Sequence, residues 1–219
     1  MAKIPFEEQA LEKDMHVFAD YLLQTDCENF MFRDFQTRNI MIKNGNPYFI
    51  DYQGGRKGAL QYDLASLLYQ SKANIPQDIR DELLNHYLDV AEKLTTIDRD
   101  KFKQYFYGYV LMRNIQTFGT YGFRVLYERK EYFIISSPFA IRNVKWVLEN
   151  AKPPIEIPAL EKALTAVVNT KAFEPFDKIK GSSSLLTVGI KSFSYKKGIP
   201  SDDSGHGEGF VFDCRFIHN

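Results

Sequence analysis

The feature that most constrains the fold is a pair of short, apolar, β-favouring runs separated by a turn. The runs are Ile40–Lys43 and Tyr48–Ile50, and between them lies Asn44-Gly45-Asn46-Pro47. Asn-Gly between such runs is the strongest short-range signal for a β-hairpin. The stretch therefore predicts two antiparallel strands joined by a tight turn.

The hairpin can have either of two registers, and each brings the same two polar side chains together. A two-residue loop at Asn44-Gly45 sets Asn39 opposite Ile50, and a loop one residue longer sets Asn39 opposite Asp51. Facing residues of an antiparallel pair lie about 5 Å apart, so the amide and the carboxylate are expected side by side. An amide oxygen and a carboxylate suit Mg²⁺, which prefers oxygen ligands and shares them with phosphates.

A third polar residue, Asp34, lies on the segment that enters the hairpin, five residues before Asn39. Asp and Asn near a hairpin are often only turn residues. The spacing nevertheless resembles the catalytic loop and metal-binding Asp of the protein-kinase-like fold. Phe32-Arg33-Asp34 corresponds to the His-Arg-Asp of kinases, and Asp51-Tyr52-Gln53 to their Asp-Phe-Gly.

The segment that follows the hairpin resembles one branch of this fold in particular. Tyr62-Asp63-Leu64-Ala65-Ser66-Leu67-Leu68 looks like the aminoglycoside phosphotransferase and choline kinase branch, and within it like bacterial kinases of cell-wall amino sugars. The resemblance covers roughly residues 6–150. It implies an α+β, mostly α-helical fold: the C-terminal lobe of a protein-kinase-like fold with a small catalytic β-hairpin, followed by a short, incomplete β tail.

The resemblance also implies a function. The chain would transfer the γ-phosphate of ATP to a hydroxyl of a small molecule, with an amino sugar or an aminoglycoside first, and Mg²⁺ and ATP as cofactors. Asp34 would be catalytic, Asn39 and Asp51 would hold Mg²⁺, and Arg33 and Asp63 would brace the catalytic loop. Weaker candidates for substrate contacts, each also readable as a structural ion pair or a solvated loop residue, are Arg38, Arg56, Lys57, Tyr121, Arg124, Glu128 and Arg129.

In relatives an N-terminal lobe with a phosphate-covering loop precedes this lobe. No G-x-G-x-x-G occurs upstream of Asp34. We therefore expect a C-lobe without its N-lobe, which would be the missing partner.

Hydrophobic periodicity predicts the helices of this lobe. They span residues 6–24, 64–70, 78–94, 99–118, 138–150 and 159–169. Asp63 and Asp98 have the N-cap preference, and Gly119 and Gly122 are expected to end the fourth helix. The first helix is expected to pack under the catalytic loop. The predicted domains are a phosphotransferase lobe over 1–170, a linker over 171–184 and a tail over 185–219.

The tail resembles the opening of the C-terminal domain of the RNase adapter protein RapZ. The match lies in Ser192-Phe193-Ser194-Tyr195-Lys196-Lys197-Gly198-Ile199-Pro200 and Val211-Phe212-Asp213-Cys214-Arg215-Phe216. It implies RNA or amino-sugar phosphate sensing, so a non-catalytic regulatory module is the alternative function. Possible phosphate or RNA contacts, in an intact domain only, are Lys191, Lys196, Lys197 and Arg215.

Composition excludes some classes of protein. Net charge is zero, so no bulk field attracts nucleic acid or an anionic membrane. No apolar run approaches the ~20 residues of a membrane span, and the N-terminus lacks a signal-peptide core. Cys27 and Cys214 match no metal spacing, and the four histidines are scattered. We expect reduced thiols, no membrane partner and a cytoplasmic location.

Overall fold

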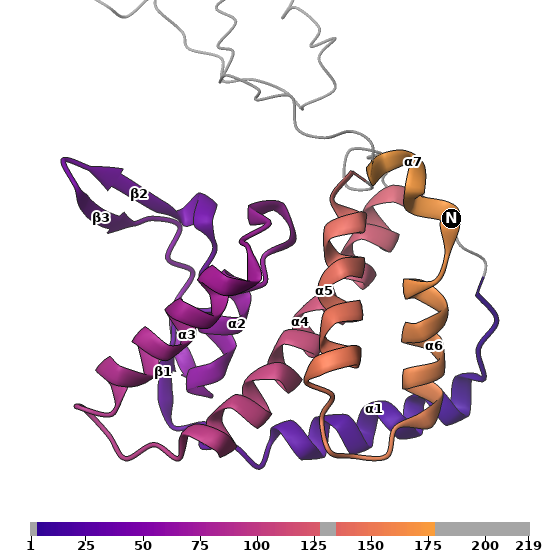
Figure 1. Ribbon diagram of the computed structural model, residues 1–219, viewed down its shortest axis with the longest axis horizontal. Coiled ribbons are helices and arrows are strands. Elements are labelled where there is room, and N and C mark those ends of the chain that lie inside the picture. Colours follow the sequence, from indigo (N-terminus) through magenta and orange to yellow (C-terminus); the bar gives the residue numbers. More distant parts are fainter. Residues whose placement is uncertain (1–3, 128–134, 178–219) are drawn as a thin grey trace, which may run out of the picture. The chain divides into compact units, whose positions relative to one another are not determined.

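The computed structural model describes residues 4–127 and 135–177 (Figure 1). The chain divides into two compact units, Met1–Lys178 and Ile179–Asn219, and every described residue lies in the first. The α-helices are α1 Glu8–Leu22, α2 Leu60–Leu68, α3 Gln77–Ala91, α4 Arg99–Leu126, α5 Ser137–Asn150, α6 Pro158–Val168 and α7 Glu174–Asp177. The strands are β1 Asn29–Met31, β2 Ile40–Lys43, β3 Asn46–Phe49 and β4 Arg56–Gly58. The expected mostly helical α+β composition is confirmed for this part of the chain.

The hairpin has the register of the two-residue loop, which is the shorter of the two loops considered. Strands β2 and β3 are antiparallel, Lys43 faces Asn46, and the Ile50 N–H donates to the Asn39 carbonyl oxygen at 3.0 Å. Asn44 and Gly45 both have positive φ, at 52° and 77°, as a two-residue turn of this kind requires. In Figure 1 the hairpin projects from the helices that follow it.

A second small sheet anchors the segment before and after the hairpin. β1 pairs antiparallel with β4, with Phe30 facing Lys57. Arg56 and Lys57, which the sequence allows to be solvated loop residues, belong to this strand, Arg56–Gly58. Glycine, lysine and arginine have low or modest β-propensity, so the sequence does not predict a strand here. The strand forms because it pairs with β1 across the sheet.

The aromatic stripe of α4 forms the centre of the core, as predicted. Buried residues on it include Phe102, Tyr105, Phe106, Tyr109 and Val110. Helices α2 and α5 both pack against α4, and α6 packs against α1 and α5. Figure 1 shows α4 running between α2 and α3 on one side and α5 on the other.

The predicted end of the fourth helix is wrong. Helix α4 continues through Gly119 and Gly122 to Leu126. A glycine inside a helix costs about 1 kcal/mol relative to alanine but does not break the hydrogen-bond ladder. Asp98 does cap α4, accepting a hydrogen bond from the Lys101 N–H at 3.0 Å.

Two other predictions about helices are also wrong. Helix α2 begins at Leu60, so Asp63 lies inside its first turn and Ala59 is the N-cap. The sequence predicts that the first helix packs under the catalytic loop, whereas α1 packs against α6 and α4. The Asp14 carboxylate explains part of that packing, because it accepts hydrogen bonds from the Ala159 and Leu160 N–H groups at the start of α6, at 2.6 and 3.0 Å.

The predicted linker is partly helical. A 3-10 turn at Lys171–Phe173 leads into α7, which contacts α5. The rest of the linker and the whole tail lie outside the described residues, so the domain boundaries stay predictions.

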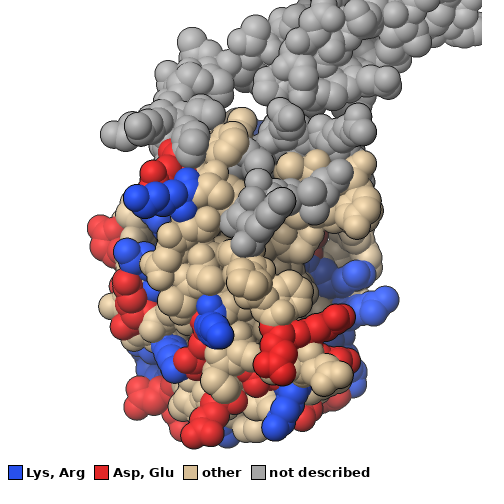
Figure 2. All heavy atoms as spheres, turned by 90° about the vertical axis from the view of Figure 1, so that its right-hand side faces the viewer, with Lys and Arg blue, Asp and Glu red and all other residues tan. Residues whose placement is uncertain are grey.

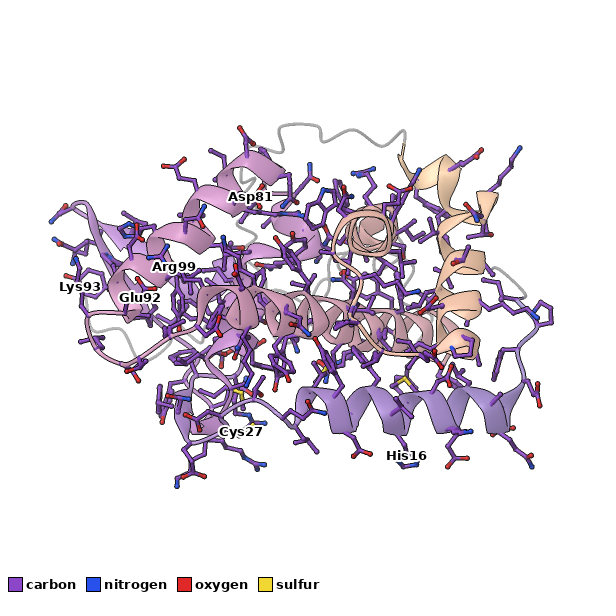
Figure 3. The ribbon with its side chains drawn as sticks, turned by 60° about the horizontal axis from the view of Figure 1, so that its bottom comes forward. His16, Cys27, Asp81, Glu92, Lys93 and Arg99 are labelled. Carbon is purple, nitrogen blue, oxygen red and sulfur yellow. The ribbon has the colours of Figure 1, made fainter. Side chains whose placement is uncertain are left out.

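The outer face of α1 and α6 mixes both signs of charge (Figure 2). His16 points outward from α1, and Arg99 lies beside Glu92 where α3 and α4 meet (Figure 3). The Arg99 guanidinium pairs with Glu92 at 2.5 Å and with Asp89 at 2.6 Å. Among the described helices, none has the combination of length and apolar character that crossing a bilayer requires.

Candidate active site

The segment that enters the hairpin holds Asp34 through side chains of its own loop. One carboxylate oxygen accepts a hydrogen bond from Gln36 Nε2, and the other pairs with the Arg38 guanidinium at 3.0 Å. Only 23% of the Asp34 side chain is exposed, against 65% of Arg38. The carboxylate therefore lies near the surface with its charge partly balanced by Arg38.

The backbone before Asp34 is strained and is held from α2. Arg33 has φ of 85°, a conformation that costs roughly 1–3 kcal/mol in a residue other than glycine. The Asp63 carboxylate accepts hydrogen bonds from the N–H groups of Phe32 and Arg33, at 2.5 and 2.9 Å. Burial raises the pKa of Asp63, whereas these two N–H groups and the charge of Arg113 oppose the rise. Asp63 thus contacts the loop that the resemblance expected it to brace.

Asn39 is buried and ties the two ends of the loop together. Its Nδ2 donates to the Asp34 carbonyl oxygen at 2.8 Å and lies 3.4 Å from an Asp34 carboxylate oxygen. Among the described residues no donor pairs with the Asn39 amide oxygen. Because the NH₂ group is committed to the loop, the amide oxygen is the group left for a ligand.

Asp51 follows the hairpin with φ of 58° and is exposed. Its carboxylate has a weak contact with Gln53 Nε2, at 3.4 Å to each oxygen. Since Asn39 faces Ile50, Asp51 is the next residue beyond the facing position. One carboxylate and one amide oxygen fit a hard cation that shares its ligands with phosphates. No cluster of three or more His, Cys, Asp or Glu residues occurs within residues 4–127 and 135–177.

The cations predicted near the loop lie in different places. Arg33 extends to the Gln53 carbonyl oxygen at 3.4 Å, which links the loop to the segment after Asp51. Arg38 contacts Asp34, and Lys57 pairs with Glu28 on the β1 side. Arg56 is exposed on β4.

A cavity of about 550 Å³ opens beside Asp34. Three segments line it: the catalytic loop, the end of α2 with the turn after it, and one face of α4. The lining residues are Gln36, Thr37, Arg38, Ala65, Ser66, Tyr69, Gln70, Ser71, Lys72, Arg113, Gln116, Thr117, Thr120 and Tyr121. Gln36 and Arg38 both line it and both contact the Asp34 carboxylate, so the carboxylate lies at its edge.

Gln70 joins two walls of this cavity. Its side-chain oxygen accepts hydrogen bonds from the Thr37 N–H at 2.9 Å and from the Thr37 hydroxyl at 2.8 Å. The end of α2 therefore fixes the turn between Asp34 and Asn39. This role carries no sequence signal, because a single Gln after a helix is an ordinary surface residue.

Of the two weak candidates on the described part of α4, Tyr121 lines the cavity and Arg124 does not. Burial raises the pKa of Tyr121, while hydrogen bonds with Ser136 and Ser71 oppose the rise, so its hydroxyl is a neutral group. Arg124 is half-buried and is not among the lining residues. Glu128 and Arg129 lie outside the described residues, as do Lys191, Lys196, Lys197 and Arg215.

Comparison with known proteins bears on this loop and hairpin. Residues 3–105 match the model of the APH family, described as a phosphotransferase enzyme family. The matched segment is just under half of the chain and contains Asp34, Asn39, Asp51 and Asp63. It supports a kinase-type phosphotransferase and leaves the acceptor and the phosphoryl donor open.

One curated relative shares a short stretch with the chain. A nucleotide-binding protein of Cereibacter sphaeroides is 42% identical over 40 residues, which are 18% of this chain and 12% of the relative. The chain thus spans about an eighth of that protein's length. The RapZ-like resemblance of the tail receives only a weak hint from this match and stays a prediction.

Proposed function

We propose that residues 4–177 form the acceptor-side lobe of an ATP-dependent phosphotransferase that acts on a hydroxyl group of a small molecule. The observation that carries the proposal is the loop from Arg33 to Asn39, in which Asp63 and Asn39 hold Asp34 at the edge of a cavity. The family match over residues 3–105 supports the same reaction class.

Asp34 has the role of accepting or orienting the proton of the acceptor hydroxyl. The hydroxyl oxygen then forms a bond to the γ-phosphorus while the bond from that phosphorus to the β,γ-bridging oxygen breaks, and ADP leaves. Such transfer depends mainly on positioning and on neutralisation of charge. The two contacts on the Asp34 carboxylate, from Gln36 and Arg38, fix its orientation toward the cavity edge.

Asn39 and Asp51 are the residues that would hold Mg²⁺. When bound, the ion supplies positive charge to the nucleotide phosphates. Two features support this assignment: the hairpin register, in which Asp51 lies one residue beyond the position that faces Asn39, and the Asn39 NH₂ contact, which leaves the amide oxygen available.

The nucleotide would approach from the hairpin side. Exposed apolar side chains there are Phe30, Met41, Ile42, Tyr48, Phe49, Ile50 and Tyr52. An apolar surface of this kind fits a covering lobe of the type that precedes this lobe in kinases. We therefore propose that full activity requires such an N-lobe.

The test measures γ-phosphate transfer from Mg·ATP to a panel of hydroxyl compounds. Two proteins are compared: the full chain, and the chain supplied with an N-lobe of a related kinase. Asp34→Asn is then made in whichever of the two is active. Loss of a general base costs roughly 10²–10⁴-fold in rate. We expect that loss in Asp34→Asn with nucleotide binding nearly intact. Transfer unchanged in Asp34→Asn, or no transfer by either protein, would refute the proposal.

A further inference from the structure

The cavity beside Asp34 is unusual in the charges on its wall. Its described lining residues include three cations, Arg38, Lys72 and Arg113, and no Asp or Glu, although Arg38 pairs with Asp34 at the cavity edge. The other polar groups are hydroxyls and amides, contributed by Ser, Thr, Gln and Tyr. A wall of this composition attracts negative charge and repels positive charge, because partly enclosed sites screen charges less than bulk water does.

Arg113 makes its hydrogen bonds with neutral groups, although its charge also acts on the Asp63 carboxyl, whose pKa it lowers. Its NH1 donates to the Tyr62 hydroxyl at 2.8 Å and to Gln116 Oε1 at 2.9 Å, both neutral acceptors. Within the described residues it makes no ion pair within 4 Å. Its guanidinium also lies 5.1 Å from the centroid of the Tyr62 ring, which fixes the planar group on the wall.

A fourth cation lies behind the wall. Arg80 is 7% exposed, and its guanidinium lies 4.2 Å from the centroid of the Tyr69 ring. Tyr69 itself lines the cavity. Arginine stays charged in proteins even when buried, so Arg80 contributes positive potential behind Tyr69, which the nearby charge of Asp81 offsets in part.

The cavity also has a polar group without a partner. Ser66 lines it, is 4% exposed, and its hydroxyl makes no hydrogen bond among the described residues. This hydroxyl is itself enclosed by neighbouring atoms, so a ligand could reach it only if Ser66 or a neighbouring side chain shifted. It is therefore the charges of the wall that indicate a ligand.

From these features we infer that the cavity binds the acceptor and selects one that carries an acid group, either a carboxylate or a phosphate, together with hydroxyls. The same charges disfavour a polyamine-like acceptor such as an aminoglycoside. The inference rests on the proposed function for the transfer step, but the binding selectivity stands on the cavity alone.

The experiment uses ligands that share one ring and differ in charge. Binding of glucuronate, glucose 1-phosphate, glucose and glucosamine to the full chain is measured by calorimetry or ligand-observed NMR, without nucleotide. We expect at least one of the two acids to bind about tenfold or more tightly than glucosamine, the yield of one charge-assisted hydrogen bond. The comparison of glucuronate with glucose 1-phosphate identifies which acid group is preferred.

Two variants locate the selectivity. Lys72→Gln, at an exposed position, and Arg113→Gln should each reduce the preference for the acid by about fivefold or more. Lys145→Gln is the matched control, because Lys145 is an exposed cation on α5 that pairs only loosely with Glu149, at 3.9 Å. It should leave all four affinities unchanged.

Several results would overturn the inference. These are equal or tighter binding of glucosamine, no binding of any ring compound, or a preference that survives both cavity variants. Failure of the transfer reaction is a separate outcome. If the chain prefers an acid but phosphorylates nothing, the inference about the cavity holds and the proposed function is refuted. If the chain preferentially phosphorylates glucosamine, the proposed function holds and the inference is refuted.

Discussion

The Asp63 carboxylate accepts a hydrogen bond from the backbone N–H of Arg33, at 2.9 Å, across 30 residues of sequence. Arg33 has positive φ, and Asp34 comes next. The strained backbone that aims Asp34 is therefore stabilised from the first turn of α2. A side chain on a packed helix positions a group on the loop, and the loop needs no regular structure of its own.

Removal of that contact should loosen the loop. Asp63→Asn keeps the shape but turns an acceptor oxygen into an NH₂ group that faces a backbone N–H. We expect a loss of roughly 1–3 kcal/mol in the free energy of unfolding and faster hydrogen exchange at Arg33. Denaturant unfolding and exchange measured by NMR check both, with Asp20→Asn on the exposed face of α1 as control. An unchanged Arg33 exchange rate would contradict the bracing role.

The two glycines inside α4 predict a gain in stability. A Cβ at Gly119 or Gly122 meets nothing within 4 Å, so alanine at either position should stabilise the chain by about 0.5–1 kcal/mol. Gly108→Ala is the contrasting variant. Its Cβ would lie 2.8 Å from Leu22 Cδ2 and 3.1 Å from Tyr21 Cε1, so about 1–3 kcal/mol should be lost. Thermal or denaturant unfolding of the three variants measures the contrast, and destabilisation by Gly119→Ala would show that α4 ends earlier.

Alkaline pH should destabilise the chain through its buried tyrosines. Burial raises the pKa of Tyr21 from 10.0 to about 12, against an opposing hydrogen bond with Gln104. Because the folded state holds this proton more tightly, its contribution to stability is complete below pH 10 and is lost as pH rises from 10 toward 12. Tyr21→Phe should show a shallower fall in unfolding free energy over that range. Identical slopes in the two proteins would contradict the assignment.

The hairpin could be predicted from sequence because its determinants are local. Asn44 and Gly45 demand a tight turn, and the turn length fixes which residue faces Asn39. The aromatic stripe of α4 and the Asp98 cap are equally local signals. The sequence predicts these elements correctly because interactions between residues close in sequence determine them.

Predictions failed where a distant partner decides. Asp63 looks like a helix cap, yet its carboxylate contacts residues 32 and 33. The cavity was missed for the same reason, because its walls come from three segments, residues 36–38, 65–72 and 113–121, that only the fold brings together. On α3, Arg80 is buried whereas the apolar Ile79 and Leu83 are exposed, because the Tyr69 ring receives the Arg80 guanidinium.

The most direct test of the central claim is Mn²⁺ binding in the presence of ATP, followed by electron paramagnetic resonance, in the full chain with and without an added N-lobe. We predict that Asn39→Ala and Asp51→Asn each weaken binding of the metal–nucleotide complex roughly tenfold or more, whereas Asp34→Asn and the control Asp20→Asn do not. Equal affinities in the wild-type protein, Asn39→Ala and Asp51→Asn would contradict the account.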